Sequence, residues 1–135
     1  MKVVESEQIW VCDIDDTVIL WDIEQFKTTE LIHITCPYDG KQYAVKPHEG
    51  NIQLVKEKRA RGCFVMLWSQ GGYQWARTVA EALGLEVDLI LSKPIGVIDD
   101  LEPVEWMPSP TYIPVDAKWK ATGKATTNNK GSKHE

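Results

Sequence analysis

The sequence predicts a single α/β domain with a mostly parallel central sheet, and three observations lead to this prediction. Short apolar runs typical of buried strands alternate along the chain with segments of helical spacing. Several of these runs are followed at once by acidic or hydroxyl residues, and open parallel sheets bind their ligands at the carboxyl ends of strands. The length of 135 residues, 43% of them hydrophobic, suits one core. We expect the domain to span residues 1–117.

The first expected elements are a strand and a β-hairpin. The apolar run 9–12 predicts a buried strand that ends in the acidic segment 13–17. Residues 31–36 and 41–46 favour strands and flank a turn sequence at 37–40, whose glycine can take a positive φ. We therefore expect a hairpin flap after the first strand.

The next expected elements are a helix, a strand and a second helix. Apolar positions recur at roughly helical spacing over residues 47–61, and Gly62 is suited to end that helix. The apolar run 63–68 predicts a strand. After residues 69–72 the apolar spacing predicts an amphipathic helix that ends at Gly84.

The last part of the chain predicts more strands and then a tail. The apolar runs 87–91 and 95–98 predict two further strands, which gives at least four in total. The proline-rich remainder has room for one edge strand at 112–115. Residues 118–135 hold five Lys against one Glu among Thr, Asn and Gly, so we expect a Lys-rich, disordered tail.

Composition argues against several classes of protein. No apolar run approaches the roughly 20 residues that span a bilayer, so we expect no membrane association and a cytoplasmic location. The three cysteines lack CxxC spacing, which argues against a disulfide framework and against a zinc ribbon. The net charge of −5 would be more negative without the tail, so a broad nucleic-acid surface on the folded body is not expected.

The acidic segment after the first strand suggests metal-assisted phosphate chemistry. Asp13 and Asp15 alternate at a strand end, where they can offer carboxylate and carbonyl oxygens to one hard cation. A carboxylate can attack phosphorus, but the two anions repel each other, so a divalent metal is needed between them. The second Asp can then act as general acid and base. The alternative is an acidic turn that only caps the following segment.

The apolar run followed by Asp13-x-Asp15-x-Thr17 resembles the first motif of the haloacid dehalogenase-like (HAD) superfamily. The resemblance implies a Rossmann-like fold in which Asp13 is the nucleophile. Asp15 would protonate the leaving group and then activate water, and its backbone carbonyl would contact Mg²⁺. Thr17 would steady the loop and the phosphate. Asp16 stands at a position that is often Gly in this superfamily.

Two later segments resemble further motifs of the same superfamily. The strand that ends in Ser69 resembles the second motif, so Ser69 and the adjacent Gln70 would bind phosphoryl oxygens; Ser69 is equally suited to cap the helix that follows. The run that ends in Asp99 and Asp100 resembles the fourth motif. The resemblance implies that Asp99 binds Mg²⁺ and that Asp100 supports it from the outer shell.

The Lys that this superfamily places beside the nucleophile has two candidates. Lys93 resembles the third motif and is favoured, since Lys is a usual phosphate partner. Lys46, at the end of the hairpin, is the alternative. Only three residues separate the two strands drawn around Lys93, and a parallel crossover needs about a dozen.

The sequence therefore predicts a Mg²⁺-dependent phosphomonoesterase that acts through an aspartyl-phosphate. The intervals where this superfamily inserts caps hold only a hairpin and helices, so we expect a hydrolase with no large cap domain and an open site. A phosphorylated small molecule such as a nucleotide, or a nucleic-acid phosphate end, is the first expected substrate. A phosphotransferase and a non-catalytic phosphate- or partner-binding module are the alternatives, and a homo-oligomer is left open.

Overall fold

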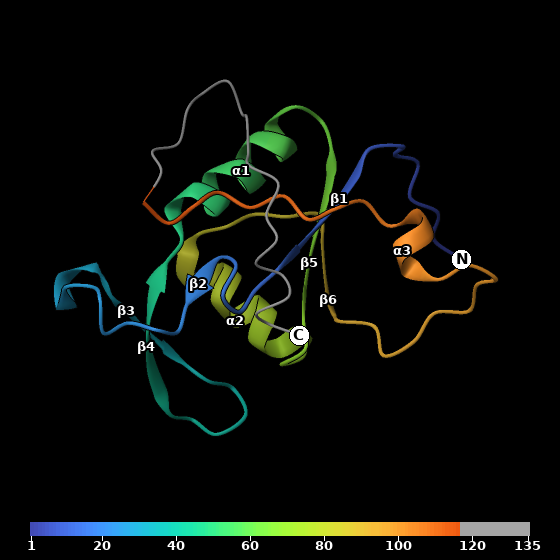
Figure 1. The fold of residues 1–135 in the computed structure, drawn as a ribbon. Helices are drawn as coiled ribbons and strands as arrows, with labels where there is room; N and C mark the ends of the chain where they lie inside the picture. The colour runs from blue at the N-terminus through green and yellow to red at the C-terminus, as the bar shows by residue number, and fades with distance from the viewer. Residues whose placement is uncertain (117–135) are drawn as a thin grey trace.

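The computed structural model describes residues 1–116, and the predicted Lys-rich tail 118–135 lies outside this part of the chain. The described elements are β1 (Ile9–Asp13), β2 (Ile19–Leu20), a 3-10 turn (Thr28–Glu30), β3 (Ile32–Thr35), β4 (Gln42–Pro47), α1 (Glu49–Ala60), β5 (Phe64–Ser69), α2 (Tyr73–Leu83), β6 (Leu89–Ser92) and α3 (Pro103–Trp106). Figure 1 shows their arrangement. No helix of the described residues is long and apolar enough to cross a membrane.

A three-stranded parallel sheet in the order β1-β5-β6 forms the centre of the fold. Asp13 is paired in register with Trp68, and Ser69 is paired with Ser92. Because all three strands run the same way, their carboxyl ends meet at one edge of the sheet. The acidic segment, the end of β5 and the end of β6 are thus neighbours, as the sequence predicts for a ligand site.

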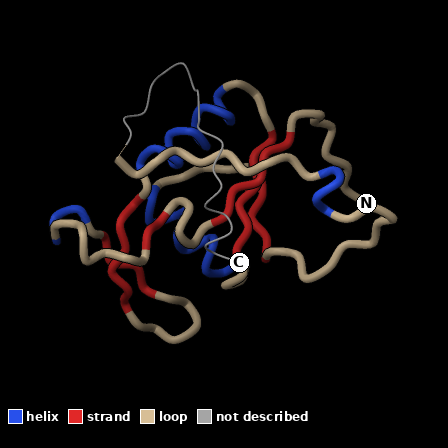
Figure 2. The backbone as a smooth tube through the Cα atoms, viewed as in Figure 1, coloured by secondary structure: helices blue, strands red, loops and turns tan. Residues whose placement is uncertain are grey.

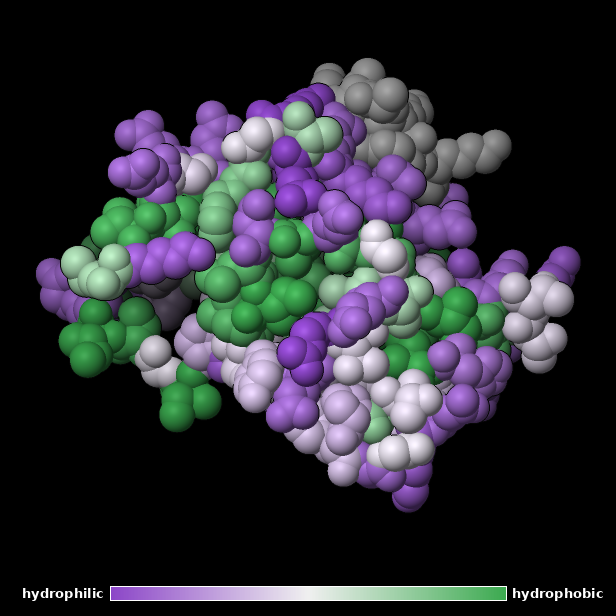
Figure 3. All heavy atoms as spheres, turned by 180° about the vertical axis from the view of Figure 1, so that it is seen from behind, coloured by the Kyte–Doolittle hydropathy of each residue, from purple (hydrophilic) through white to green (hydrophobic). Residues whose placement is uncertain are grey.

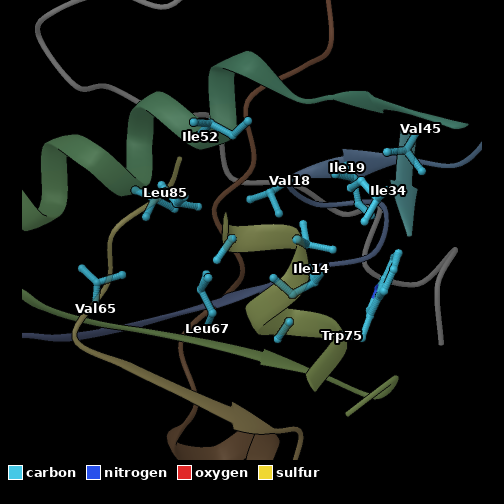
Figure 4. Close-up of a cluster of buried hydrophobic side chains, with 14 of the residues drawn as sticks. Ile14, Val18, Ile19, Ile34, Val45, Ile52, Val65, Leu67, Trp75 and Leu85 are labelled. Atoms are coloured by element: carbon cyan, nitrogen blue, oxygen red, sulfur yellow. The ribbon is translucent and has the colours of Figure 1, made fainter. Parts of the chain in front are cut away.

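The two long helices lie on the same face of this sheet because of its strand order. Successive strands are added in one direction, and right-handed crossovers then place both connecting helices on one side. Figure 4 shows side chains from α1, β5 and the loop after β1 that point toward one another and form the core between the helices and the sheet. The core cluster comprises Ile14, Val18, Ile19, Ile34, Val45, Ile52, Val55, Cys63, Val65, Leu67, Trp75, Ala76, Val79, Ala80 and Leu85.

The other face of the parallel sheet is also apolar, and neither of the two long helices, α1 and α2, covers it. The pleat and the register place Ile9, Val11, Met66 and Leu89 on that face. Ile9, Val11 and Leu89 are exposed, whereas Met66 is half-buried. Figure 3, seen from behind, shows hydrophobic side chains gathered on this side of the molecule.

A second, antiparallel sheet in the order β2-β4-β3 stands beside the first, as Figure 2 shows. The β3–β4 pair confirms the predicted hairpin, with Ile34 opposite Tyr43 and with Gly40 at a φ of +71° in the turn. The two-residue strand β2 was not predicted. It pairs with the end of β4 and so ties the acidic segment to the hairpin.

Two predicted strands are absent and are corrected here. Residues 95–98 form a loop with exposed apolar side chains, because the two residues between Ser92 and this run cannot make a parallel crossover. Residues 112–115 form no strand either. The parallel sheet therefore has three strands rather than four.

Candidate functional site

The acidic loop after β1 is a tight turn built around one buried residue. The carbonyl oxygen of Ile14 accepts from the backbone N–H groups of Thr17, Val18 and Ile19, at 3.2, 3.0 and 3.4 Å. Asp16 has a φ of +56° and is the only non-glycine residue with a positive φ in the described chain. Asp tolerates this left-handed conformation better than most residues because its short side chain bonds locally. The position where the superfamily often has Gly is thus one where the backbone favours Gly.

The Asp15 carboxylate lies at the centre of the site and accepts three hydrogen bonds. Oδ1 accepts from Nε1 of Trp21 at 2.9 Å and from Nε1 of Trp75 at 3.0 Å. Oδ2 accepts from the Ser69 hydroxyl at 3.3 Å. The Thr17 hydroxyl donates to the carbonyl oxygen of Asp15 at 3.5 Å. The structure therefore brings Asp15, Thr17 and Ser69 together.

An aromatic cluster surrounds the donors to Asp15. Trp21 stacks on Trp75 with ring centroids 6.0 Å apart, and the Tyr43 ring meets Trp21 edge-on at 5.7 Å. The backbone N–H of Trp21 also donates to Oδ1 of Asp16 at 3.2 Å. Trp21 is therefore anchored to two successive acidic residues of the loop.

Asp13 lies at the end of β1, on the face that it shares with Trp68, while Ser69 points to the helix side of the sheet. Cys12, the residue before Asp13, points to the helix side of the sheet and packs against the core. Burial raises the pKa of the Cys12 thiol to about 12, and the charge of Asp13 adds to the effect. The thiol is therefore neutral beside the predicted nucleophile.

Ser69 is fully buried and holds the turn between β5 and α2. Its Oγ accepts from the backbone N–H of Gly71 at 3.0 Å while donating to Asp15. The first N–H of α2, that of Tyr73, is instead bound by Oγ of Ser92 at 2.9 Å. Capping of α2 by Ser69, the alternative drawn from sequence, is thus wrong. Gln70 is exposed in the same turn.

The two candidate lysines have different surroundings. The backbone N–H of Lys93 donates to the carbonyl oxygen of Ser69 at 2.9 Å, so Lys93 lies at the edge where the strands end. Nζ of Lys46 lies 5.7 Å from the centroid of the Phe26 ring. The choice between Lys93 and Lys46 as the Lys of this site stays a prediction.

Asp99 and Asp100 are not brought to the acidic loop. Both are exposed in the segment between β6 and α3, which runs away from β2 and α2 in Figure 1. The backbone N–H of Leu101 donates to Oδ1 of Asp99 at 3.0 Å, which lowers the pKa of this carboxyl, and Asp100 contributes too. In residues 1–116 no three His, Cys, Asp or Glu side chains form a cluster that suits a metal ion. The metal roles of Asp13, Asp15, Asp99 and Asp100 stay predictions.

Asn51 supports the acidic loop from α1 and was missed in the sequence. Its Nδ2 donates to the carbonyl oxygen of Thr17 at 2.9 Å, and its Oδ1 accepts from the N–H of Ile113 at 2.9 Å. Near it, His48 meets the Tyr112 ring edge-on, with centroids 4.9 Å apart. Asn51 could have been noticed in the sequence because it is a polar residue on the apolar face of the predicted helix 47–61.

The partners of Asp15 were also missed. Trp75 was expected to be a core residue and is buried, but its indole N–H reaches the carboxylate. Packing in the core or against the hairpin was expected for Trp21, with stacking on a nucleobase as the alternative, and Ser92 was not considered. No family model, no curated protein and no solved structure matches this chain, so its site is described by its own geometry alone.

Proposed function

We propose that this protein is a Mg²⁺-dependent phosphomonoesterase in which Asp13 is the nucleophile and Asp15 is the general acid and base. The observation that carries the proposal is the hydrogen bond from Ser69 to Asp15, which joins the ends of β1 and β5. Through this bond the Asp15 carboxylate, which can transfer a proton, lies beside the Ser69 hydroxyl and the glycine turn, which are suited to bind a phosphoryl group. The exposed Gln70 and the nearby Lys93 extend the same edge.

The reaction has two balanced steps. A carboxylate oxygen of Asp13 bonds to phosphorus while the bond to the ester oxygen breaks, and the ester oxygen leaves as an alcohol with the proton of Asp15. Water then attacks the aspartyl-phosphate and gives a proton to Asp15. The bond between phosphorus and Asp13 breaks, which releases inorganic phosphate and restores both carboxyl groups.

Magnesium fits the donors of the acidic loop. Mg²⁺ is usually held by one or two carboxylates together with phosphate oxygens and water, and the loop offers the Asp13 carboxylate and the Asp15 carbonyl. When bound, the ion supplies charge neutralisation between the carboxylate and the phosphate. Adding Asp99 and Asp100 to this set requires the segment after β6 to move toward β1.

Nucleotides and nucleic-acid phosphate ends are the substrates we propose first, because Trp21 and Tyr43 put aromatic rings beside Asp15. The second candidate is a non-catalytic phosphate-binding module. It is favoured by one observation, namely that both oxygens of Asp15 are already hydrogen-bonded. A phosphotransferase would share the first step and pass the phosphoryl group to another acceptor.

The test is phosphate release from nucleotides, oligonucleotide ends, sugar phosphates and phosphopeptides, with Mg²⁺ or with a chelator. We expect release by the wild type with Mg²⁺ and at least a hundredfold loss in Asp13→Asn, since removal of a nucleophile eliminates its step. The matched control is Asp22→Asn, an exposed Asp outside the loop, which should keep the wild-type rate. Equal activity of Asp13→Asn, or activity with chelator, would refute the proposal.

A further inference from the structure

We propose that Trp21 and Trp75 are positioning residues that hold Oδ1 of Asp15 and leave Oδ2 as the oxygen that transfers the proton. The inference rests on the proposed function and assigns roles to two residues that the motifs do not contain. It starts from the geometry of three hydrogen bonds to one carboxylate.

The two indole N–H groups come from unrelated parts of the fold and meet at one atom. Trp21 follows β2, Trp75 lies in the first turn of α2, and both donate to Oδ1 of Asp15. An indole N–H can only donate, and a buried one needs an acceptor. Trp75 is 6% exposed, so Asp15 supplies the acceptor that its buried position demands.

The indoles are themselves fixed, which allows them to fix the carboxylate. Trp21 and Trp75 stack with an interplanar angle of 28°, and Tyr43 closes the edge of Trp21. The backbone bond from Trp21 to Asp16 adds a further restraint. Two stacked donors on one oxygen define the plane of the carboxylate better than one donor does.

The two oxygens of Asp15 consequently have different roles. A carboxylate oxygen has two lone pairs, and both on Oδ1 are used by the indoles. Within residues 1–116, Oδ2 has one hydrogen bond, the 3.3 Å bond from Ser69, and so retains a lone pair. Oδ2 is therefore the oxygen of Asp15 that can carry the proton which the proposed reaction transfers.

The experiment compares two substrates in variants that remove the N–H donor. Trp75→Phe and Trp21→Phe keep one aromatic ring, although it is smaller than the indole. An alkyl phosphate has a poor leaving group that needs the proton of Asp15, whereas p-nitrophenyl phosphate has a good one that does not. We expect kcat for the alkyl phosphate to fall about tenfold or more, as part of a general-acid contribution of about 10²–10⁴. For p-nitrophenyl phosphate it should fall less than about threefold, with KM unchanged for both.

The controls are Trp10→Phe and Trp106→Phe, which lie away from Asp15. They should leave both substrates unaffected. A merely structural role for Trp21 and Trp75 would lower both rates equally, and this result would overturn the proposal. Unchanged rates for both substrates in both Trp→Phe variants would overturn it as well.

A second measurement does not depend on activity or on folding of the Trp variants. The full chain has six Trp, hence six indole N–H signals in an ¹H–¹⁵N spectrum. We expect two of them to shift in Asp15→Asn and none to shift by a comparable amount in Asp22→Asn. If the wild type releases no phosphate but these two signals shift, the hydrogen bonds from the two indoles to Asp15 are supported and the phosphatase proposal fails. If no indole signal shifts, these hydrogen bonds are themselves refuted.

Discussion

At the scale of single residues, the acidic loop depends on a backbone conformation that few side chains accept. Asp16 adopts a φ of +56°, which an ordinary L residue takes at a cost of roughly 1–2 kcal/mol. Its carboxylate offsets part of this cost by binding the N–H of Trp21. Asp16 thus contributes to the loop through its conformation, while Asp15 contributes through its carboxylate.

Cys12 gives a prediction about pH. Because burial raises the pKa of its thiol from 9.0 to about 12, the thiolate fraction at pH 8 is about a thousandfold smaller than in the unfolded chain. We expect iodoacetamide at pH 8 to leave Cys12 unmodified in the native protein and to alkylate it in urea. Peptide mass spectrometry measures both.

The sign of the linked effect on stability follows from the same pKa. Above pH 9 the unfolded chain loses the Cys12 proton while the folded chain keeps it, so the free energy of unfolding falls as pH rises from about 9 toward 12. In Cys12→Ala this part of the fall should be absent. Rapid alkylation of Cys12 in the native protein would contradict the raised pKa.

The positions of site residues were predictable from sequence only where the residue ends an apolar run. Asp13 and Ser69 do so, and both lie at the carboxyl ends of neighbouring strands. The contact between Trp75 and Asp15 joins residues 60 positions apart. Spacing within the sequence carries no information on such a pair, because it depends on how α2 packs.

At the scale of elements, the turn between β5 and α2 meets the hairpin turn at position 72. Gly72 has a φ of +96°, and a Cβ there would overlap the hydroxyl of Tyr38 from the hairpin turn. The hairpin therefore reaches the turn that follows Ser69. This contact links the two sheets at the proposed site.

Gly72 has a backbone conformation that side chains rarely adopt, because its φ of +96° is combined with a ψ of 162°. This region is occupied almost only by Gly, and another residue there costs roughly 1–3 kcal/mol. We therefore expect Gly72→Ala to lower the free energy of unfolding by about 1–3 kcal/mol, with the contact to Tyr38 as a further cost. Urea unfolding measures the loss.

A second substitution separates the contact from the backbone strain. In a Tyr38→Ala background the Cβ at position 72 meets no hydroxyl, so Gly72→Ala should cost less than it does in the wild type. Gly62→Ala is the control, because a Cβ there has nothing within 4 Å and its cost should be the same in both backgrounds. An equal cost of Gly72→Ala in both backgrounds would contradict a contribution from the contact.

Among the elements, the long periodic ones were predictable and the short ones were not. The predicted helices 47–61 and 73–83 match α1 and α2 closely, and Gly84 ends α2 at a φ of +62°. The two residues of β2 carry no periodicity that could be read. The wrong strand at 95–98 was predicted from its apolar residues, but the connection from β6 is too short to bring it into the parallel sheet.

At the scale of the whole molecule, apolar residues are divided unequally between the two sides of the parallel sheet. The helix side holds the core, whereas Ile95 and Ile98, in the loop after β6, are 107% and 105% exposed. Their apolar character therefore contributes no burial to folding. From the apolar pattern alone, Ile95 and Ile98 were predicted to lie in a strand, like the apolar runs that are buried.

The same substitution at a buried and at an exposed Ile tests this difference. Ile98→Ala should change the free energy of unfolding by less than about 0.5 kcal/mol, as for other exposed sites. Ile19→Ala, at a fully buried position, should lower it by about 2–5 kcal/mol. Urea denaturation of both variants gives the two values. A large loss in Ile98→Ala would mean that the loop is buried in solution.

The bridge through Asn51 has a consequence for the order in which the chain matures on the ribosome. The parallel sheet and both long helices are complete once Ser92 has been synthesised, whereas the amide of Asn51 that supports Thr17 receives its second partner from Ile113. A nascent chain halted before residue 113 would therefore contain β1 to β6 and yet leave the side-chain oxygen of Asn51 without this partner beneath the acidic loop. Synthesis of the segment around Ile113 is what completes the support of that loop.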